Sequence, residues 1–293
     1  MAQFTFEAIG TSWQIDVYEA LFPDRERALL VSIHERIDHF DQIYSRFRSD
    51  SLVTKISKEA GVYDLPEDAG LMMRLYFDLY KRTNGLMTPL IGNLIATAGY
   101  DANYSLKQIR DLEKPFSWEE AIEYKDGKLK VLKPVLLDFG AAGKGYLIDL
   151  VAKVLEEDGI PAYCIDAGGD ILKKGGESLR VGLENPSNIQ EVIGVFTLDT
   201  GSICGSAGNR RIWEKFTHIM NPETLESQKN ILAVWVYAKH AILADALATA
   251  LFFVSPEVLL GYEFEYALIR KDHRLEKSNG FNAEFFTTDT ISP

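Results

Sequence analysis

The sequence contains two patterns of apolar residues, one typical of β-strands and one typical of amphipathic helices. These patterns do not alternate regularly along the chain, and this order is the feature that most constrains the fold. Apolar and polar residues alternate over residues 4–8 and 13–17, which predicts a hairpin that turns near Gly10. From Arg25 to Tyr44 apolar residues recur at every third or fourth position, as in an amphipathic helix. Because strands and helices follow no regular order, we expect an α+β fold of mixed strands and helices, not a doubly wound sheet.

The same patterns predict the remaining elements. Helices are expected over residues 52–56, 68–83, 145–157 and 241–253, and strands over 130–132, 162–165, 179–183, 193–198, 202–204, 231–238 and 266–270. Gly and Pro interrupt the stretch from 85 to 114, which makes it too irregular to be a simple helix, and a polar tail is expected after residue 270. No repeat, low-complexity tract or linker divides the chain, so residues 1–293 are predicted to form a single domain.

Composition excludes several classes of function. The net charge is −12, from 43 acidic and 31 basic side chains, which argues against nucleic acid or an anionic membrane as the partner. The longest apolar segment, 241–254, contains Asp245 and is too short to span a bilayer. The N-terminus has no secretory signal pattern, so a cytoplasmic protein without a membrane anchor is predicted. Cys164 and Cys204 lack metal-ligand spacing and are expected to be reduced core thiols.

A glycine-rich segment from Asp138 to Asp149, with the sequence DFGAAGKGYLID, precedes a predicted helix. Small residues before Lys144 let backbone N–H groups approach a phosphate, and the helix N-terminus and the ammonium add positive potential. The spacing fits neither a Walker A loop nor a dinucleotide-binding fingerprint. A tight strand-to-helix turn with a solvated Lys144 explains the pattern equally well.

A second candidate lies in the apolar helix predicted over residues 241–253. Asp245 and Thr249 are four residues apart and therefore share one helical face. A buried carboxylate needs a partner, and a hard divalent cation with oxygen ligands would provide one. The alternative is that Asp245 caps a helix or pairs with a lysine, while Thr249 bonds to its own helix.

Three further segments have both a functional and a structural interpretation. His218 precedes an Asn-Pro turn, but a lone histidine is usually structural. The segment Asp166–Asp170 places two glycines between acids, which suits close approach to a ligand or a plain β-turn. The segment Tyr44–Ser51 offers aromatic rings with Arg46 and Arg48, suited to a nucleotide or to a helix end.

Together these segments resemble the ApbE-type flavin transferases, the FAD:protein FMN transferases, over nearly the whole chain. The family pattern is matched, in order, by Gly10-Thr11-Ser12, Ser45 with Phe47, Asp50-Ser51-Leu52, Asp138-Phe139-Gly140, Lys144-Gly145-Tyr146 with Asp149, Gly168-Gly169-Asp170, His218-Ile219 with Pro222 and Thr224, and Ala244-Asp245-Ala246 with Thr249. The segments Asp138–Asp149 and Ala244–Ala250 are the most specific.

The resemblance implies two intimately packed subdomains with FAD in a cleft between them. It implies that Mg²⁺ is held by the Ala141 carbonyl, Asp245 and Thr249, and that His218 and Asp245 serve catalysis. The residues it places at FAD are Ile9, Ser45, Leu86, Met87, Thr88, Asp138, Lys144, Gly168, Gly169 and His218. In the family, FMN passes from FAD to a Thr or Ser of a separate acceptor flavoprotein, and AMP leaves.

Some positions depart from the family pattern. Thr88 replaces the acid of G-A-F-D, Asn221 replaces that of D-P-x-T-G, Ala207 ends the T-S-G element, and Ile9 stands for the methionine of M-G-T. These departures fall around the flavin and acceptor channel and leave the proposed metal ligands intact. The expected function is Mg²⁺-dependent FMN transfer; the alternatives are an FAD pyrophosphatase and a non-catalytic FAD-binding protein.

Overall fold

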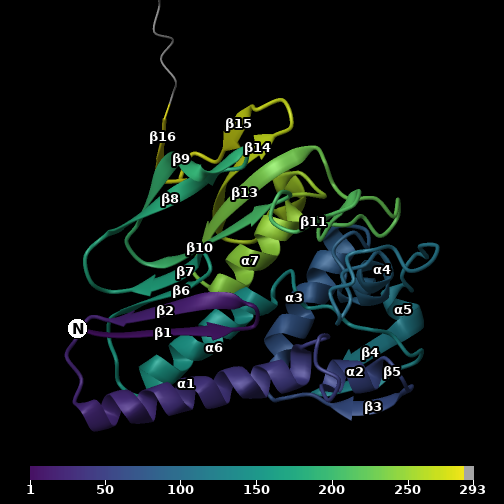
Figure 1. The fold of residues 1–293 in the computed structure, drawn as a ribbon, viewed down its shortest axis with the longest axis horizontal. Helices are drawn as coiled ribbons and strands as arrows, with labels where there is room; N and C mark the ends of the chain where they lie inside the picture. Colours follow the sequence, from purple (N-terminus) through teal and green to yellow (C-terminus); the bar gives the residue numbers. More distant parts are fainter. Residues whose placement is uncertain (287–293) are drawn as a thin grey trace, which may run out of the picture.

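A large antiparallel sheet forms the centre of the computed structural model, which describes residues 1–286 (Figure 1). Its spatial strand order is β1-β2-β6-β7-β10-β13-β14-β15, and every neighbouring pair is antiparallel. The strand bounds are Ala2–Ala8 (β1), Thr11–Val17 (β2), Tyr163–Ala167 (β6), Asp170–Lys174 (β7), Gly201–Ala207 (β10), Ile231–Ala238 (β13), Phe264–Arg270 (β14) and Leu275–Lys277 (β15). The expected mixed α+β fold and the β1–β2 hairpin are confirmed.

Different layers cover the two faces of this sheet. Along β13, Val234 and Val236 belong to the main core, which also contains buried residues of the helices α1 (Pro23–Tyr44), α6 (Gly143–Glu157) and α7 (Ala241–Ala250). The alternate residues Ala233 and Trp235 belong to a second core. That core is shared with a small sheet of β8 (Leu179–Asn185), β9 (Asn188–Leu198) and β16 (Ala283–Phe285). The period of two along β13 therefore places helices on one face and a sheet on the other.

Most of the segments between residues 52 and 131 lie beside the end of α1 that leads into α2 (Figure 1). These segments are α2 (Leu52–Ile56), β3 (Gly61–Asp64), α3 (Ala69–Arg82), η1 (Pro89–Ile91), α4 (Gly92–Thr97), α5 (Trp118–Ala121), β4 (Ile122–Lys125) and β5 (Lys128–Val131). The other elements are β11 (Ile212–Trp213), β12 (Phe216–Thr217) and η2 (Pro256–Leu259). A third apolar cluster joins α4 to the β11–β12 hairpin through Leu94, Ile95, Trp213 and Phe216. Among the described residues, no helix is both long and apolar enough to span a membrane.

The stretch from 85 to 114 is too irregular to be a simple helix, as expected, although it contains the short helices η1 and α4, whose apolar residues Leu90, Leu94 and Ile95 are buried. One expectation was wrong. The segment after residue 270 was expected to be a polar tail, yet it forms β15 and β16 and buries Phe281 in the second core. Residues 287–293 of that expected tail lie outside the described part. Cys164 and Cys204 are buried and free, as expected.

Candidate active site

The glycine-rich segment forms the turn that leads into α6. Asp138 Oδ1 accepts a hydrogen bond from the backbone N–H of Gly140 at 2.7 Å, and the Asp138 N–H donates to the Pro89 carbonyl at 2.7 Å. The Gly143 N–H then donates to the Phe139 carbonyl at 2.7 Å, which starts the helix. The turn interpretation is therefore correct, and the same turn presents the N-terminus of a buried helix to its surroundings.

Asp138 is also fixed by Arg46. The buried Arg46 guanidinium forms an ion pair with Asp138 Oδ2 and donates to the Tyr100 carbonyl at 2.7 Å. Its planar group lies 4.2 Å from the centre of the Phe47 ring, so it also makes a cation–π contact. Arg46 therefore joins the end of α1 to the turn before α6, and no sequence pattern indicated this pairing.

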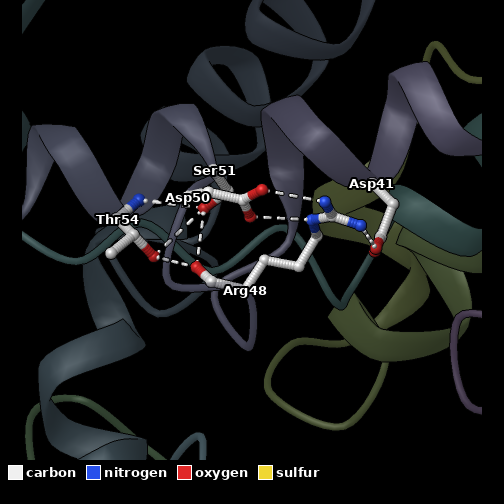
Figure 2. Close-up of polar contacts among 5 residues, drawn as sticks. All are labelled: Asp41, Arg48, Asp50, Ser51 and Thr54. Carbon is white, nitrogen blue, oxygen red and sulfur yellow. Dashed lines mark hydrogen bonds and ion pairs between the residues drawn. The ribbon is translucent and has the colours of Figure 1, made fainter.

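Arg48, the other arginine of the segment, has a structural role. Its guanidinium donates to both carboxylate oxygens of Asp50 at 3.0 Å and to Asp41 at 3.3 Å (Figure 2). Ser51, the N-cap of α2, accepts the Thr54 N–H at 3.1 Å (Figure 2). For Arg48 the helix-end interpretation is the correct one.

Lys144, in the first turn of α6, is not a solvated side chain. Its Nζ lies 2.7 Å from Asp170 Oδ2 as an ion pair and donates to the Ala167 carbonyl at 3.2 Å. Asp170 is buried, and its Oδ1 accepts the Gly205 N–H at 3.0 Å. Burial alone would lower the pKa of Lys144, but the carboxylates of Asp170 and Asp245 raise it above its usual value. Lys144 therefore places a stable positive charge at the start of α6.

Asp245 is buried on α7, directly against α6. Its Oδ2 accepts the Gly145 N–H at 2.9 Å, while Oδ1 accepts no hydrogen bond from residues 1–286. Burial and then the neighbouring Asp170 raise the pKa of Asp245 to about 8, against the opposing effect of Lys144 and the Gly145 N–H. The carboxylate therefore has one bonded oxygen and one available oxygen in an environment that opposes its charge.

The crossing of α6 and α7 requires glycine at position 145. An added Cβ would lie 2.2 Å from the Ala241 carbonyl oxygen and 2.7 Å from Asp245 Cβ, so no larger residue fits. The two helices are therefore in backbone contact beside Asp245. Thr249 lies one turn further along α7 and is half-buried, and the half-buried Ala141 lies in the turn before α6.

These residues suit a hard cation such as Mg²⁺. Within residues 1–286 no three His, Cys, Asp or Glu side chains form a metal-binding group, so a cage made of protein side chains alone is not available. Mg²⁺ is commonly held by one or two carboxylates together with substrate phosphates and water. A buried Asp245 with an unbonded Oδ1, supplemented by a hydroxyl and a carbonyl oxygen, fits that mode of binding.

His218 follows β12 and is half-buried with an unbonded ring nitrogen. Its Nδ1 is buried without a hydrogen-bond partner in the described chain. Burial first, then the positive charge of Arg211, lowers the pKa of His218 to about 4; Lys144 acts in the same direction and Asp138 opposes it. His218 is therefore neutral at pH 7 and can accept a proton.

Two turns with predicted FAD contacts lie side by side. Trp13 pairs with Ala167 in the sheet, which brings the β1–β2 turn next to the β6–β7 turn. An added Cβ on Gly168, whose φ is +65°, would lie 2.0 Å from Thr11 Oγ1. Ile9 has a φ of +46°, which is strained for a β-branched residue. Gly168 and Gly169 are exposed, so their backbone is open to a ligand.

The other predicted flavin contacts differ in their surroundings. Thr88 is buried and caps η1, since its hydroxyl accepts the Leu90 N–H at 3.2 Å. Met87 is part of the main core, while Leu86 is half-buried. Ser45 is half-buried at the end of α1, directly before Arg46. Thr88 is thus engaged in local structure where the family pattern has an acid.

Tyr76 of α3 was not among the predicted site residues. Its buried hydroxyl has no hydrogen-bond partner within residues 1–286. Burial first, then the charges of Asp138 and Asp245, raises its pKa well above the usual value. The core-facing period of α3 would have indicated burial of Tyr76, but nothing in the sequence placed it near two acids.

Asn221, where the family pattern has an acid, has a role in local structure. Its side-chain Oδ1 accepts the N–H groups of Glu223 and Thr224 at 2.8 and 3.0 Å, which closes the turn after His218. Leu225, where the family pattern has glycine, has a φ of +61°. The chain therefore retains the left-handed turn without glycine, at a cost of about 1 kcal/mol.

Two surface hollows of the described chain lie elsewhere. They have volumes of about 570 and 710 Å³, lie along α3, and share Arg74 and Tyr124 as lining residues. None of the residues predicted to bind FAD or Mg²⁺ lines either hollow. The candidate site therefore rests on its side-chain chemistry.

Comparison with known proteins identifies the family of this chain. The family model described as the ApbE family matches residues 9–264. The FAD:protein FMN transferase of Escherichia coli (strain K12) is 24% identical over 277 residues, covering 86% of this chain and 78% of the relative. That of Treponema pallidum (strain Nichols) is 24% identical over 299 residues, covering 90% and 80%.

Solved structures share the fold. The ApbE protein of Thermotoga maritima superposes with a TM-score of 0.83 at 22% identity, covering 97% of this chain and 99% of that one. The flavin transferase ApbE from Vibrio cholerae gives a TM-score of 0.81 at 20% identity, covering 96% and 97%. Because the family model matches most of its length, this chain belongs to the ApbE family.

Proposed function

We propose that this protein transfers FMN from FAD to a Thr or Ser hydroxyl of an acceptor flavoprotein, with Mg²⁺, and releases AMP. The relatives named FAD:protein FMN transferase support the reaction class. The observation that carries the proposal is the convergence of Lys144, Asp245 and a neutral His218 at the α6 N-terminus.

The α6 N-terminus and Lys144 are proposed to hold the pyrophosphate of FAD. Backbone N–H groups of the first helical turn and the ammonium group provide positive potential for a doubly charged anion. Asp170 holds the ammonium in place from the opposite side. Gly168 and Gly169 allow the pyrophosphate to approach the neighbouring turn, because neither carries a side chain.

The Ala141 carbonyl, Asp245 and Thr249 are proposed to hold Mg²⁺. The ion supplies charge neutralisation at the pyrophosphate when bound. The chain's own residues do the rest: Asp245 is fixed by the Gly145 N–H, and its raised pKa reflects a site that favours a positively charged partner.

His218 is proposed to take the proton of the acceptor hydroxyl. The hydroxyl oxygen forms a bond to the phosphorus of the FMN half, and the bond from that phosphorus to the bridging oxygen breaks. AMP leaves with the bridging oxygen, and the proton passes to the unbonded Nδ1. The reaction depends on position and charge neutralisation more than on a covalent intermediate.

The Asp245→Ala variant tests this assignment. We expect AMP release from FAD and Mg²⁺, with a flavoprotein acceptor present, to fall to the level seen with EDTA. The variant should remain folded, as judged by circular dichroism. AMP release at the rate of the unmodified protein would contradict the metal assignment.

A further inference from the structure

Helix α7 does not cap its own N-terminus. Its N-cap residue, His240, forms no capping hydrogen bond with its side chain, and the first turn contains no acidic residue. The first N–H groups of a helix need partners when they are buried, and Ala241 and Ile242 are both buried. Their partner comes from another helix.

Asp149 of α6 provides that partner. Its Oδ1 accepts the Ala241 N–H at 2.9 Å and its Oδ2 accepts the Ile242 N–H at 2.9 Å. Both carboxylate oxygens are therefore used by the first turn of α7. A carboxylate at this position also interacts favourably with the positive end of the helix dipole.

Within residues 1–286, this contact is one of two polar contacts that join α6 to α7. The Gly145 N–H of α6 donates to the Asp245 carboxylate of α7. One helical turn further along α6, the Asp149 carboxylate accepts the N–H of Ala241, which lies one turn before Asp245 on α7. At Gly145 the helices are in backbone contact, so there is no space for compensating side-chain movement. Losing the contact at Asp149 would leave the hydrogen bond from Gly145 to Asp245 as the polar contact between α6 and α7.

We propose that Asp149 is a positioning residue that sets Asp245 and Thr249 at the metal site by capping α7. The proposal rests on the proposed function, since it assumes that these two residues bind the metal. The half-buried carboxylate of Asp149 lies outside the proposed metal site and acts on metal affinity through the helix that it caps. Removing residues that orient a metal ligand commonly weakens metal binding by about 10- to 100-fold.

The test compares Asp149→Ala and Asp149→Asn with the matched control Ser117→Ala. Ser117 is the N-cap of α5, where its hydroxyl accepts the Glu120 N–H, so the control also removes a helix cap. Mn²⁺ serves as the probe, because it occupies oxygen-ligand sites of the Mg²⁺ type and its free ion is measured by electron paramagnetic resonance. The full chain is titrated in the presence of FAD, and melting temperatures are recorded in parallel.

We expect Asp149→Ala to weaken Mn²⁺ binding by about 10-fold or more, with little change in FAD affinity measured in EDTA. Asp149→Asn keeps one acceptor oxygen and should give an intermediate loss. Ser117→Ala should lower the melting temperature and leave Mn²⁺ binding unchanged. If Asp149→Ala does not fold, Asp149→Asn decides the question.

Unchanged Mn²⁺ affinity in the folded Asp149 variants would overturn the proposal. Equal losses in Asp149→Ala and Asp149→Asn would also overturn it, because they would indicate an effect of charge and not of the cap. Asp245→Ala separates the two hypotheses. If Asp245→Ala binds Mn²⁺ normally, the metal assignment is wrong. If Asp245→Ala loses Mn²⁺ binding but the Asp149 variants keep it, the inference about Asp149 is wrong and the metal assignment stands.

Discussion

Replacing Asp245 with asparagine is expected to stabilise the metal-free protein while abolishing its proposed activity. The carboxylate is buried and lies near Asp170, and these effects raise its pKa from 3.8 to about 8. Asparagine has nearly the same shape, and its oxygen can still accept the Gly145 N–H. The substitution therefore removes a buried charge and keeps the hydrogen bond.

The magnitude follows from linkage between protonation and folding. A carboxyl whose pKa is higher in the folded than in the unfolded protein destabilises the fold progressively as the pH rises from 3.8 to about 8. One pKa unit corresponds to about 1.4 kcal/mol, so the destabilisation reaches at most about 6 kcal/mol at pH 8 and less than about 2 kcal/mol at pH 5. Asp245→Asn should recover part of this energy, and more of it at pH 8.

Urea unfolding of both proteins in EDTA, at pH 5 and at pH 8, measures the effect. The account predicts a higher free energy of unfolding for Asp245→Asn at pH 8 and a smaller gain at pH 5. Adding Mg²⁺ with FAD should stabilise the unmodified protein only. A variant that is less stable than the unmodified protein at pH 8, or a gain independent of pH, would refute the reasoning.

Three further predictions concern the same site. Lys144→Met should destabilise the protein by about 3 kcal/mol, because it leaves the buried Asp170 without its partner. The double variant Lys144→Met with Asp170→Asn should regain much of this stability. Its affinity for FAD, measured by flavin fluorescence, should still be about 10-fold weaker than that of the unmodified protein. Unchanged affinity would contradict the assignment of Lys144 to the pyrophosphate. Because the pKa of His218 is lowered to about 4, kcat/KM should not decline near pH 6.5 on acidification, and an inflection there in a pH series would contradict the lowered pKa of this base. Gly145→Ala should prevent folding, since the added Cβ would lie 2.2 Å from a backbone oxygen. The control Gly61→Ala, whose Cβ would have no contact closer than 3.7 Å, should melt at the temperature of the unmodified protein. A Gly145→Ala variant that melts at the same temperature as the control would contradict the close helix crossing.

Local patterns predicted much of the fold. The hairpin at Gly10 and the long helix α1 were expected from periodicity, because each buries one regular face. The strand β13 was expected as well, and it is apolar along both of its faces because both are buried. The helix expected over residues 68–83 is α3, and Asn84 and Gly85, which follow it, have positive φ. In these elements local preference and tertiary packing agree.

Short elements were missed where burial depends on distant partners. The strand β16 has only three residues, and its pairing with β9 is decided by the second core. Phe281 is buried there although its neighbours in sequence are polar. No local period identifies such a segment, because the residues that cover it lie far away in the chain.

The sequence indicated which residues are candidates for the site, but not the contacts that hold them together. Lys144, Asp245 and His218 were singled out from the sequence, and the structure brings them into electrostatic contact with one another or with shared acids. The pairing of Arg46 with Asp138 and the capping of α7 by Asp149 were not predicted. Each is a contact between residues about 90 positions apart, which depends on how the helices pack.

The most direct test of the proposed function is the fate of the FMN half of FAD. The purified protein is incubated with FAD, Mg²⁺ and an acceptor flavoprotein that carries a Thr or Ser flavinylation site. AMP is measured by chromatography, and acceptor mass by mass spectrometry. The account predicts AMP and covalently flavinylated acceptor in equal amounts, both absent in EDTA. AMP accompanied by free FMN, or FAD binding without any AMP, would contradict the transferase.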